Sequence, residues 1–176
     1  MGETHMKRKS LAVGAVAVAV GPFIAMAGAQ AASAPHTVYV SAGHGAAGGK
    51  HGPVFSSVNA AIAAVATGGT VVVEKGTYRE DVAVGKAVRI EGQRGATIDA
   101  SQLINGIKIT APHVTVTGLT VENAVGEGIL LQNTSSVTVL GNTVHSNDTG
   151  VRLTNPVANT ESPIPLMICG RKYATP

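Results

Sequence analysis

Two basic residues, Lys108 and Arg152, occupy equivalent positions in a short segment that recurs along the chain. The segment runs from Gly106 to Thr110, from Gly128 to Gln132 and from Gly150 to Thr154, so its copies begin at a constant spacing. An arginine can hold a carboxylate through two hydrogen bonds, and it can stabilise negative charge that develops during a reaction. The spacing therefore identifies Lys108 and Arg152 as candidates for anion binding or for catalysis.

Within each copy two apolar residues stand two positions apart, which is the pattern of a strand with one buried face. The intervening residues then point outward and form two columns, Lys108–Leu130–Arg152 and Thr110–Gln132–Thr154. If neighbouring copies pair as strands, the two cations lie about 9.6 Å apart, which is two strand spacings. We predict substrate contacts from the second column, whose members are Thr110, Gln132 and Thr154. The alternative is that all these side chains only solvate an exposed sheet face.

Two carboxylates, Glu127 and Asp148, stand at the start of successive copies. Calcium sites are built from several such oxygens, so we predict this pair as metal ligands and Ca²⁺ as the one cofactor the chain would use. Two carboxylates supply fewer oxygens than a calcium site ordinarily uses. Asp99 and Glu122 are expected on other turns.

The elements that must position these residues change character at Thr70. Before it, apolar residues recur three and four apart over residues 55–66, which predicts one amphipathic helix capped by Ser56 or Ser57. From Thr70 onward the apolar residues recur every second position, which predicts short strands. A second self-match aligns residues 113–121 with 136–144.

Twenty-two residues separate the copies, and this length suits three short strands and three turns, which make one coil of a parallel β-helix. Stacked coils bury a continuous apolar interior that no single coil could bury alone. Gly118 and Gly141 allow backbone bends with positive φ, and Asn142 can hydrogen-bond along the stack. A β-sandwich of hairpins is the structural alternative, but it gives no reason for the repeat.

Composition excludes several classes of protein. Among 176 residues there is one cysteine, so a disulfide-stapled fold is excluded. The formal charge of +3 comes mainly from residues 7–9; without residues 1–31 the balance is 10 basic against 9 acidic residues. This leaves no basic stripe for a nucleic-acid partner.

Residues 1–31 have the charged, apolar and small-residue order of a secretory signal. We therefore predict a secreted, extracellular protein that has no membrane association after cleavage and is a monomer. A retained membrane helix is the alternative, although glycine and proline interrupt the apolar run. The predicted organisation is a signal peptide (1–31), an N-terminal strand and Gly/His loop (32–53), and a capping helix with a parallel β-helix (54–155).

The last segment, 156–176, departs from the repeat. Another copy is due near residue 172, yet the segment has no alternation and contains Pro163, Pro165 and an apolar cluster at 166–168. We interpret it as an irregular tail that is not native to the fold. The competing interpretation is a cap in which those apolar residues cover the last coil.

Three segments resemble the opening coils of right-handed parallel β-helix proteins of the pectin-lyase-like superfamily, namely residues 69–80, 88–92 and 96–99. The later copies look like the carbohydrate-binding and sugar-hydrolase repeats of the same group. The resemblance implies an all-β fold of about four coils, a helix plugging the N-terminal end, and a sugar-binding face on the sheet that carries Lys108. The two cations, Lys108 and Arg152, on such a hydroxyl-rich face suit an acidic, uronate-containing polysaccharide as partner. No Asp-Asp pair is present, and the glutamine expected before Asp148-Thr149 is missing, so the resemblance does not carry over a catalytic set.

Three hypotheses about function follow. In the first, the chain is a polysaccharide lyase or epimerase in which Arg152 or Lys108 is the base or charge stabiliser while Asp148 and Glu127 hold calcium. In the second, it is a non-catalytic binding or surface module. In the third, it is an incomplete remnant of a lyase-like protein.

Overall fold

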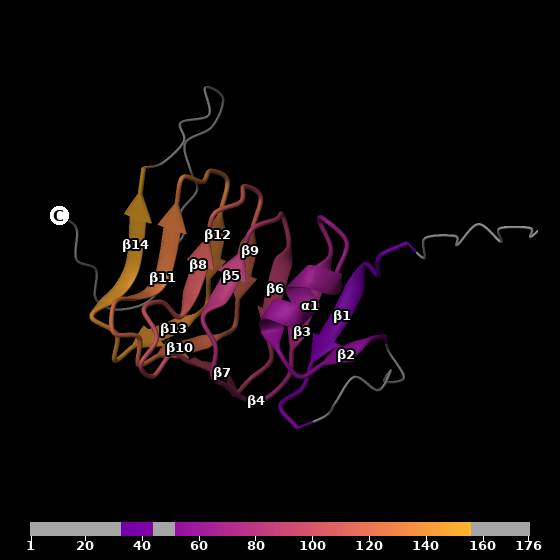
Figure 1. Cartoon of the computed structure of the whole chain (residues 1–176), viewed down its shortest axis with the longest axis horizontal. Helices are drawn as coiled ribbons and strands as arrows, with labels where there is room; N and C mark the ends of the chain where they lie inside the picture. Colours follow the sequence, from indigo (N-terminus) through magenta and orange to yellow (C-terminus); the bar gives the residue numbers. More distant parts are fainter. Residues whose placement is uncertain (1–32, 44–51, 156–176) are drawn as a thin grey trace, which may run out of the picture. The chain divides into compact units, whose positions relative to one another are not determined.

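The computed structural model describes residues 33–43 and 52–155, which form a right-handed parallel β-solenoid of about four coils with one short helix (Figure 1). All strand pairs among these residues are parallel. The repeat therefore predicted the fold class correctly. The described part of the chain contains no helix with the length and hydrophobicity that crossing a bilayer needs. The predicted signal peptide, the cap or tail at 156–176 and part of the Gly/His loop lie outside the described residues and stay predictions.

Three sheets run along the stack, and we name them A, C and D. Sheet A has the order β12-β9-β6-β3-β1-β2, sheet C has β13-β10-β7-β4, and sheet D has β14-β11-β8-β5. Sheet A consists of β1 (Thr37–Val40), β2 (Val54–Phe55), β3 (Thr70–Val73), β6 (Arg89–Gly92), β9 (Thr115–Thr117) and β12 (Thr138–Leu140). Sheet C consists of β4 (Gly76–Tyr78), β7 (Ala96–Asp99), β10 (Thr120–Glu122) and β13 (Thr143–His145). Sheet D consists of β5 (Val82–Val84), β8 (Ile107–Ile109), β11 (Glu127–Gln132) and β14 (Thr149–Thr154).

The strand register confirms the repeat. Ile107 lies beside Ile129, which lies beside Val151, so sheet D advances by the predicted spacing between these copies. In sheet A, Thr115 lies beside Thr138, a step that is longer by a single residue. The extra residue falls in the turn that leads from sheet D to sheet A, as the displaced self-match predicted.

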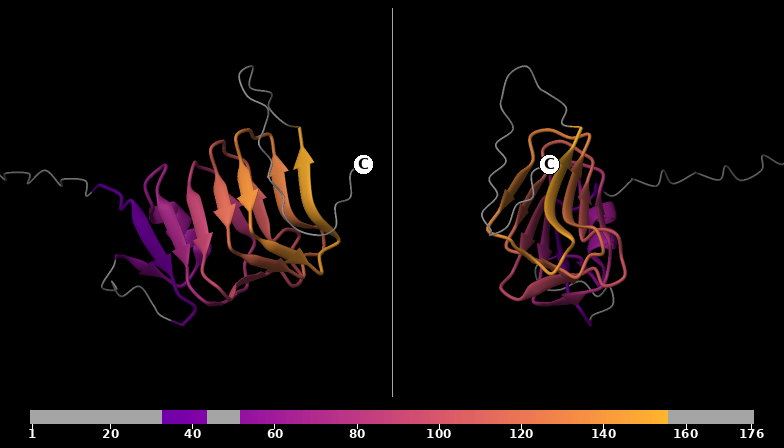
Figure 2. Two further views of the ribbon diagram at one scale, coloured as in Figure 1. Left: turned by 180° about the vertical axis from the view of Figure 1, so that it is seen from behind. Right: turned by 90° about the vertical axis from the view of Figure 1, so that its left-hand side faces the viewer.

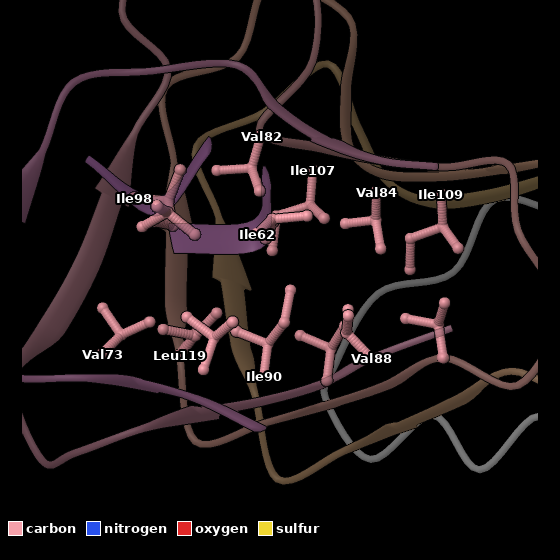
Figure 3. Packing of buried hydrophobic residues seen from close by; sticks show 14 of the residues in the cluster. Ile62, Val73, Val82, Val84, Val88, Ile90, Ile98, Ile107, Ile109 and Leu119 are labelled. Atoms are coloured by element: carbon pink, nitrogen blue, oxygen red, sulfur yellow. The ribbon is translucent and has the colours of Figure 1, made fainter. Parts of the chain in front are cut away.

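The core is a stack of Val, Ile and Leu side chains between the sheets. Figure 3 shows side chains from several coils meeting in the interior, among them Val82 and Ile107 from neighbouring strands of sheet D. These two residues and Ile90 are at most 1% exposed. Each strand is short, but its apolar residues pack against the same positions in the coils on either side. Apolar burial therefore runs continuously along the solenoid.

The helix α1 (Val58–Ala64) is shorter than the predicted 55–66, because Phe55 belongs to β2. Ser57 caps its first turn by accepting a hydrogen bond from the backbone N–H of Ala60, as the sequence indicated. Val58, Ala61 and Ile62 form its buried face. The helix packs against β1, β2, β3 and β5 and so lies on the N-terminal side of the stack (Figure 2).

Short turns between sheets A and C depend on glycine and asparagine. Gly118 and Gly141 have φ values of 72° and 65°, which are accessible to glycine without strain. Asn142 is buried. Its amide donates to the carbonyl of Val116 at 2.8 Å and accepts from the backbone N–H of Leu119 at 2.9 Å. The prediction that Asn142 bonds along the stack is confirmed.

Candidate functional site

The candidate site is the outer face of sheet D. The register places Lys108 beside Leu130 and Leu130 beside Arg152, with Ala83 preceding them on β5. The neighbours Ile109, Leu131 and Leu153 on these strands face the interior. Alternation of inward and outward side chains along each strand thus brings the two predicted cations into one outward column, two strands apart.

The second predicted column lies further along the same strands. Gln132 is in register with Thr154, and Thr110 directly follows β8. The hydroxyl of Thr110 donates to the carbonyl of Val84, and that of Thr154 donates to the carbonyl of Leu131, both at 3.4 Å. Each hydroxyl oxygen still has lone pairs that can accept a bond from a ligand. The structure therefore brings Thr110, Gln132 and Thr154 to one edge of the face, and their role in substrate binding stays a prediction.

Arg152 is joined to one of the predicted metal ligands. Its Nη1 lies 2.7 Å from Oε1 of Glu127, which is the carboxylate of the neighbouring strand. The Glu127 side chain is only 15% exposed, whereas that of Arg152 is 56% exposed. The guanidinium therefore leans toward the start of β11 but keeps donors that face solvent. Nothing in the repeat pattern indicated this pairing.

The predicted calcium ligands do not by themselves fit a calcium site. Glu127 is already paired with Arg152, and Asp148 is exposed. Within residues 33–43 and 52–155, no group of three or more His, Cys, Asp or Glu side chains is arranged to hold a metal ion. Calcium coordination ordinarily uses six to eight oxygens. We derive no reaction step through calcium, and the assignment of Asp148 and Glu127 as ligands stays a prediction.

A buried amide lies close to the same strand. Asn105 is 7% exposed, and its Oδ1 has no hydrogen-bond partner among the described residues. The next residue, Gly106, donates its backbone N–H to the carbonyl of Glu127 at 3.0 Å. Asn105 was missed at the sequence level, because it falls in a turn outside the recurring segment.

A separate charged row lies on sheet C. Asp99, Glu122 and His145 share one register position on successive strands, so Asp99 and Glu122 end strands and do not lie on turns as expected. Glu122 lies 3.2 Å from Nε2 of His145. Asp99 accepts hydrogen bonds from Ser101 and Asn123, and these bonds hold the pKa of its carboxyl below the ordinary value, with the nearby arginine Arg79 adding to the effect. The row belongs to a different sheet from Lys108 and Arg152.

The segment 76–80, on which part of the family resemblance rests, stabilises the N-terminal end. Glu80 accepts hydrogen bonds from the backbone N–H of Val58 at 2.7 Å and of Asn59 at 3.1 Å, and from the Ser57 hydroxyl at 2.8 Å. A carboxylate at a helix N-terminus satisfies free N–H groups and interacts favourably with the helix dipole.

Tyr78 in the same segment is buried, and its hydroxyl donates toward the carbonyls of Val40 and Glu74. Burial raises the pKa of this phenol. The segment is thus structural in this chain, and its strand, β4, belongs to sheet C and not to sheet D.

Comparison with known proteins agrees with this architecture. The chain matches the family described as "Right handed beta helix region" over residues 60–162, and it belongs to that family. No curated protein matches the chain at a significant level.

The solved structures that resemble the chain include pectin methylesterases. One of them, in complex with hexasaccharide VII, has a TM-score of 0.56 and 14% sequence identity. The match covers 69% of this chain and 46% of that structure. Pectin methylesterase PemA from Erwinia chrysanthemi has a TM-score of 0.54 and 14% identity, with the same two coverages. At this identity the likeness shows the fold alone. The chain spans about half the length of these structures.

Proposed function

We propose that this protein binds an acidic, uronate-containing polysaccharide on the outer face of sheet D. The observation that carries the proposal is the register that places Lys108 and Arg152 in one outward column. Two cations at fixed separation along a shallow face can each engage a ligand carboxylate. The column runs along the stack, so a linear polymer would lie across successive coils.

The surrounding groups suit a sugar chain. Leu130 lies between the cations and is half-buried, so it offers an apolar surface to the carbon face of a sugar ring. The hydroxyls of Thr110 and Thr154 and the amide of Gln132 can bond sugar hydroxyls. One of the similar structures is a pectin methylesterase in complex with a hexasaccharide, and this supports a polysaccharide as the class of ligand. With the signal segment expected at 1–31, we place this binding outside the cell, by a monomer.

Binding is proposed here without a catalytic step. A calcium-dependent lyase would need several carboxylate oxygens beside Arg152, and Glu127 supplies one carboxylate that Arg152 itself neutralises. The lyase hypothesis predicts formation of unsaturated uronides from pectate or alginate, with activity lost in the presence of a chelator. Ultraviolet absorbance of the reaction mixture measures this directly. Product formation would replace the binding proposal with an enzymatic one.

The binding test compares cationic side chains on two sheets. The variant Arg152→Ala should lose retention on immobilised polygalacturonate, and wild-type retention should fall as salt increases because exposed charges are screened. The matched control is Arg89→Ala. Arg89 is 55% exposed, pairs with Glu91 at 3.8 Å and lies on sheet A, so it resembles Arg152 in exposure and pairing but not in position. Equal losses in both variants would show non-specific attraction and would refute the proposed face.

A further inference from the structure

The sheet D column has a charge pattern with a period of two coils. Its cations, Lys108 and Arg152, are separated by Leu130, and the position before Lys108 is Ala83. Neighbouring strands lie about 4.8 Å apart, so the two cations repeat at about 9.6 Å. The column thus alternates between a position that attracts a carboxylate and a position that does not.

One coil advances by about the length of one sugar unit in an extended chain. A linear glycan lying along the column therefore presents successive sugar units to successive strands. A carboxylate over Lys108 and another two units away over Arg152 would both meet a cation. A carboxylate on the unit between them would lie over Leu130, where it would lose water without gaining a partner.

Glu127 leaves this pattern unchanged. Its carboxylate is 2.7 Å from Arg152 and largely buried, so it is paired with that arginine, and β11 itself carries no basic residue. An extra ligand carboxylate on the middle unit would therefore meet no cation on β11. The apolar side chain of Leu130 and the lack of a basic residue on this strand both disfavour a ligand that is charged at every unit.

We propose, as an extension of the function proposed above, that this face selects acidic glycans whose carboxylates fall on every second sugar unit. The ligand class is a linear polymer that alternates uronate with a neutral sugar. A polymer of uronate alone would bind the same face more weakly per chain of equal length.

Isothermal titration of the chain with two sets of oligosaccharides tests this selection. One set is hyaluronan fragments, which alternate glucuronate and a neutral amino sugar, and the other is oligogalacturonates with the same number of sugar units. We expect the wild type to bind the hyaluronan fragments about threefold more tightly, a difference typical of one exposed charge interaction. The oligogalacturonates carry twice the charge, so non-specific attraction would give the opposite order.

The variant Leu130→Lys should reverse this order, because it places a cation under the middle unit. Its matched control is Leu140→Lys, which makes the same change on an exposed leucine of sheet A and should leave the order unchanged. Glu127→Gln provides a second test, because it releases Arg152 from its partner and should increase affinity for both ligand sets without changing their order. Glu91→Gln, beside Arg89 on sheet A, is its control.

The outcomes separate the two proposals. Failure of both ligand sets to bind the wild type and its variants would refute the function proposed above, and the selection with it. Binding of both sets with oligogalacturonates preferred by the wild type would leave the function standing and overturn the selection alone. Equal effects of Leu130→Lys and Leu140→Lys would also overturn it, since only total charge would then matter.

Discussion

Within the described residues, the first coils and the last coil of the solenoid differ in burial. At the N-terminal end, α1 covers the first strands, and Val38, Val40 and Val58 are fully buried. In the last described coil, three core positions are only half-buried, whereas the residues in register with them one coil earlier are at most 1% exposed. The half-buried residues are Val144, Val151 and Leu153, and their buried neighbours are Val121, Ile129 and Leu131.

The difference shows that each coil completes the burial of the coil before it. Among the described residues, the core positions of the last coil pack against the coil before them. Two asparagines add hydrogen bonds between the same two coils. Asn142 bonds Val116 and Leu119, and Asn147 bonds Val121 and Ala124, all in the preceding coil. Side-chain amides therefore attach this coil in addition to its apolar contacts.

The largest expected effect compares the same residue type in two neighbouring coils. Val121→Ala should lower the free energy of unfolding by about 2–3 kcal/mol, because it removes fully buried methyl groups and leaves a cavity. Val144→Ala, in register with it, should lower that free energy by about 1 kcal/mol, because its side chain is only partly buried. Urea denaturation followed by circular dichroism measures both. Equal losses would show that the two coils are equally buried in solution.

The attachment of α1 on the N-terminal side of the solenoid depends on Glu80. Glu80→Ala should lower the free energy of unfolding by about 2 kcal/mol, since it leaves the N–H groups of Val58 and Asn59 without their acceptor. Hydrogen exchange should speed up first in α1. Glu91→Ala is the control, because that carboxylate pairs only with an exposed arginine and its loss should cost less than about 0.5 kcal/mol. A similar loss in both variants would argue against a capping role.

The asparagine attachments should give the smallest effect. Asn142→Ala should lower the free energy of unfolding by about 1–2 kcal/mol, because it strands a buried N–H and a buried carbonyl. Asn147→Ala should lower it less, because Asn147 is half-buried and water can replace part of its bonding. Thermal unfolding of the two variants provides the comparison. A larger loss for Asn147→Ala would contradict this ranking.

Sequence reasoning predicted sheets A and D well and placed sheet C less well, for a physical reason. Strands of sheet D carry two inward apolar residues, such as Ile107 and Ile109, and the longer strands of sheet A do the same, which produces visible alternation. Strands of sheet C carry fewer inward apolar residues; β10, for example, has Val121 alone. A single apolar residue has no period, so the bounds of those strands came only from the structure.

The candidate site was predictable only where its residues occupy equivalent positions of the repeat. The repeat aligns equivalent positions, and this was sufficient to place Lys108, Leu130 and Arg152 in one column. The contact between Arg152 and Glu127 joins positions that are not equivalent in the repeat, because Glu127 lies beside Thr149. Alignment of copies therefore could not reveal it. The same limit concealed Glu80, whose partners lie far earlier in the chain, at the start of α1.

The register of sheet D also bears on how such a surface can change during evolution. Duplication of one repeat would add one coil, and every existing side chain of sheet D would keep its inward or outward orientation. The outer face of sheet D could then lengthen or shorten in whole coils, without redesign of the residues already present. Within such an added coil, one substitution at the position equivalent to Leu130 would change the outward surface while leaving the apolar core intact.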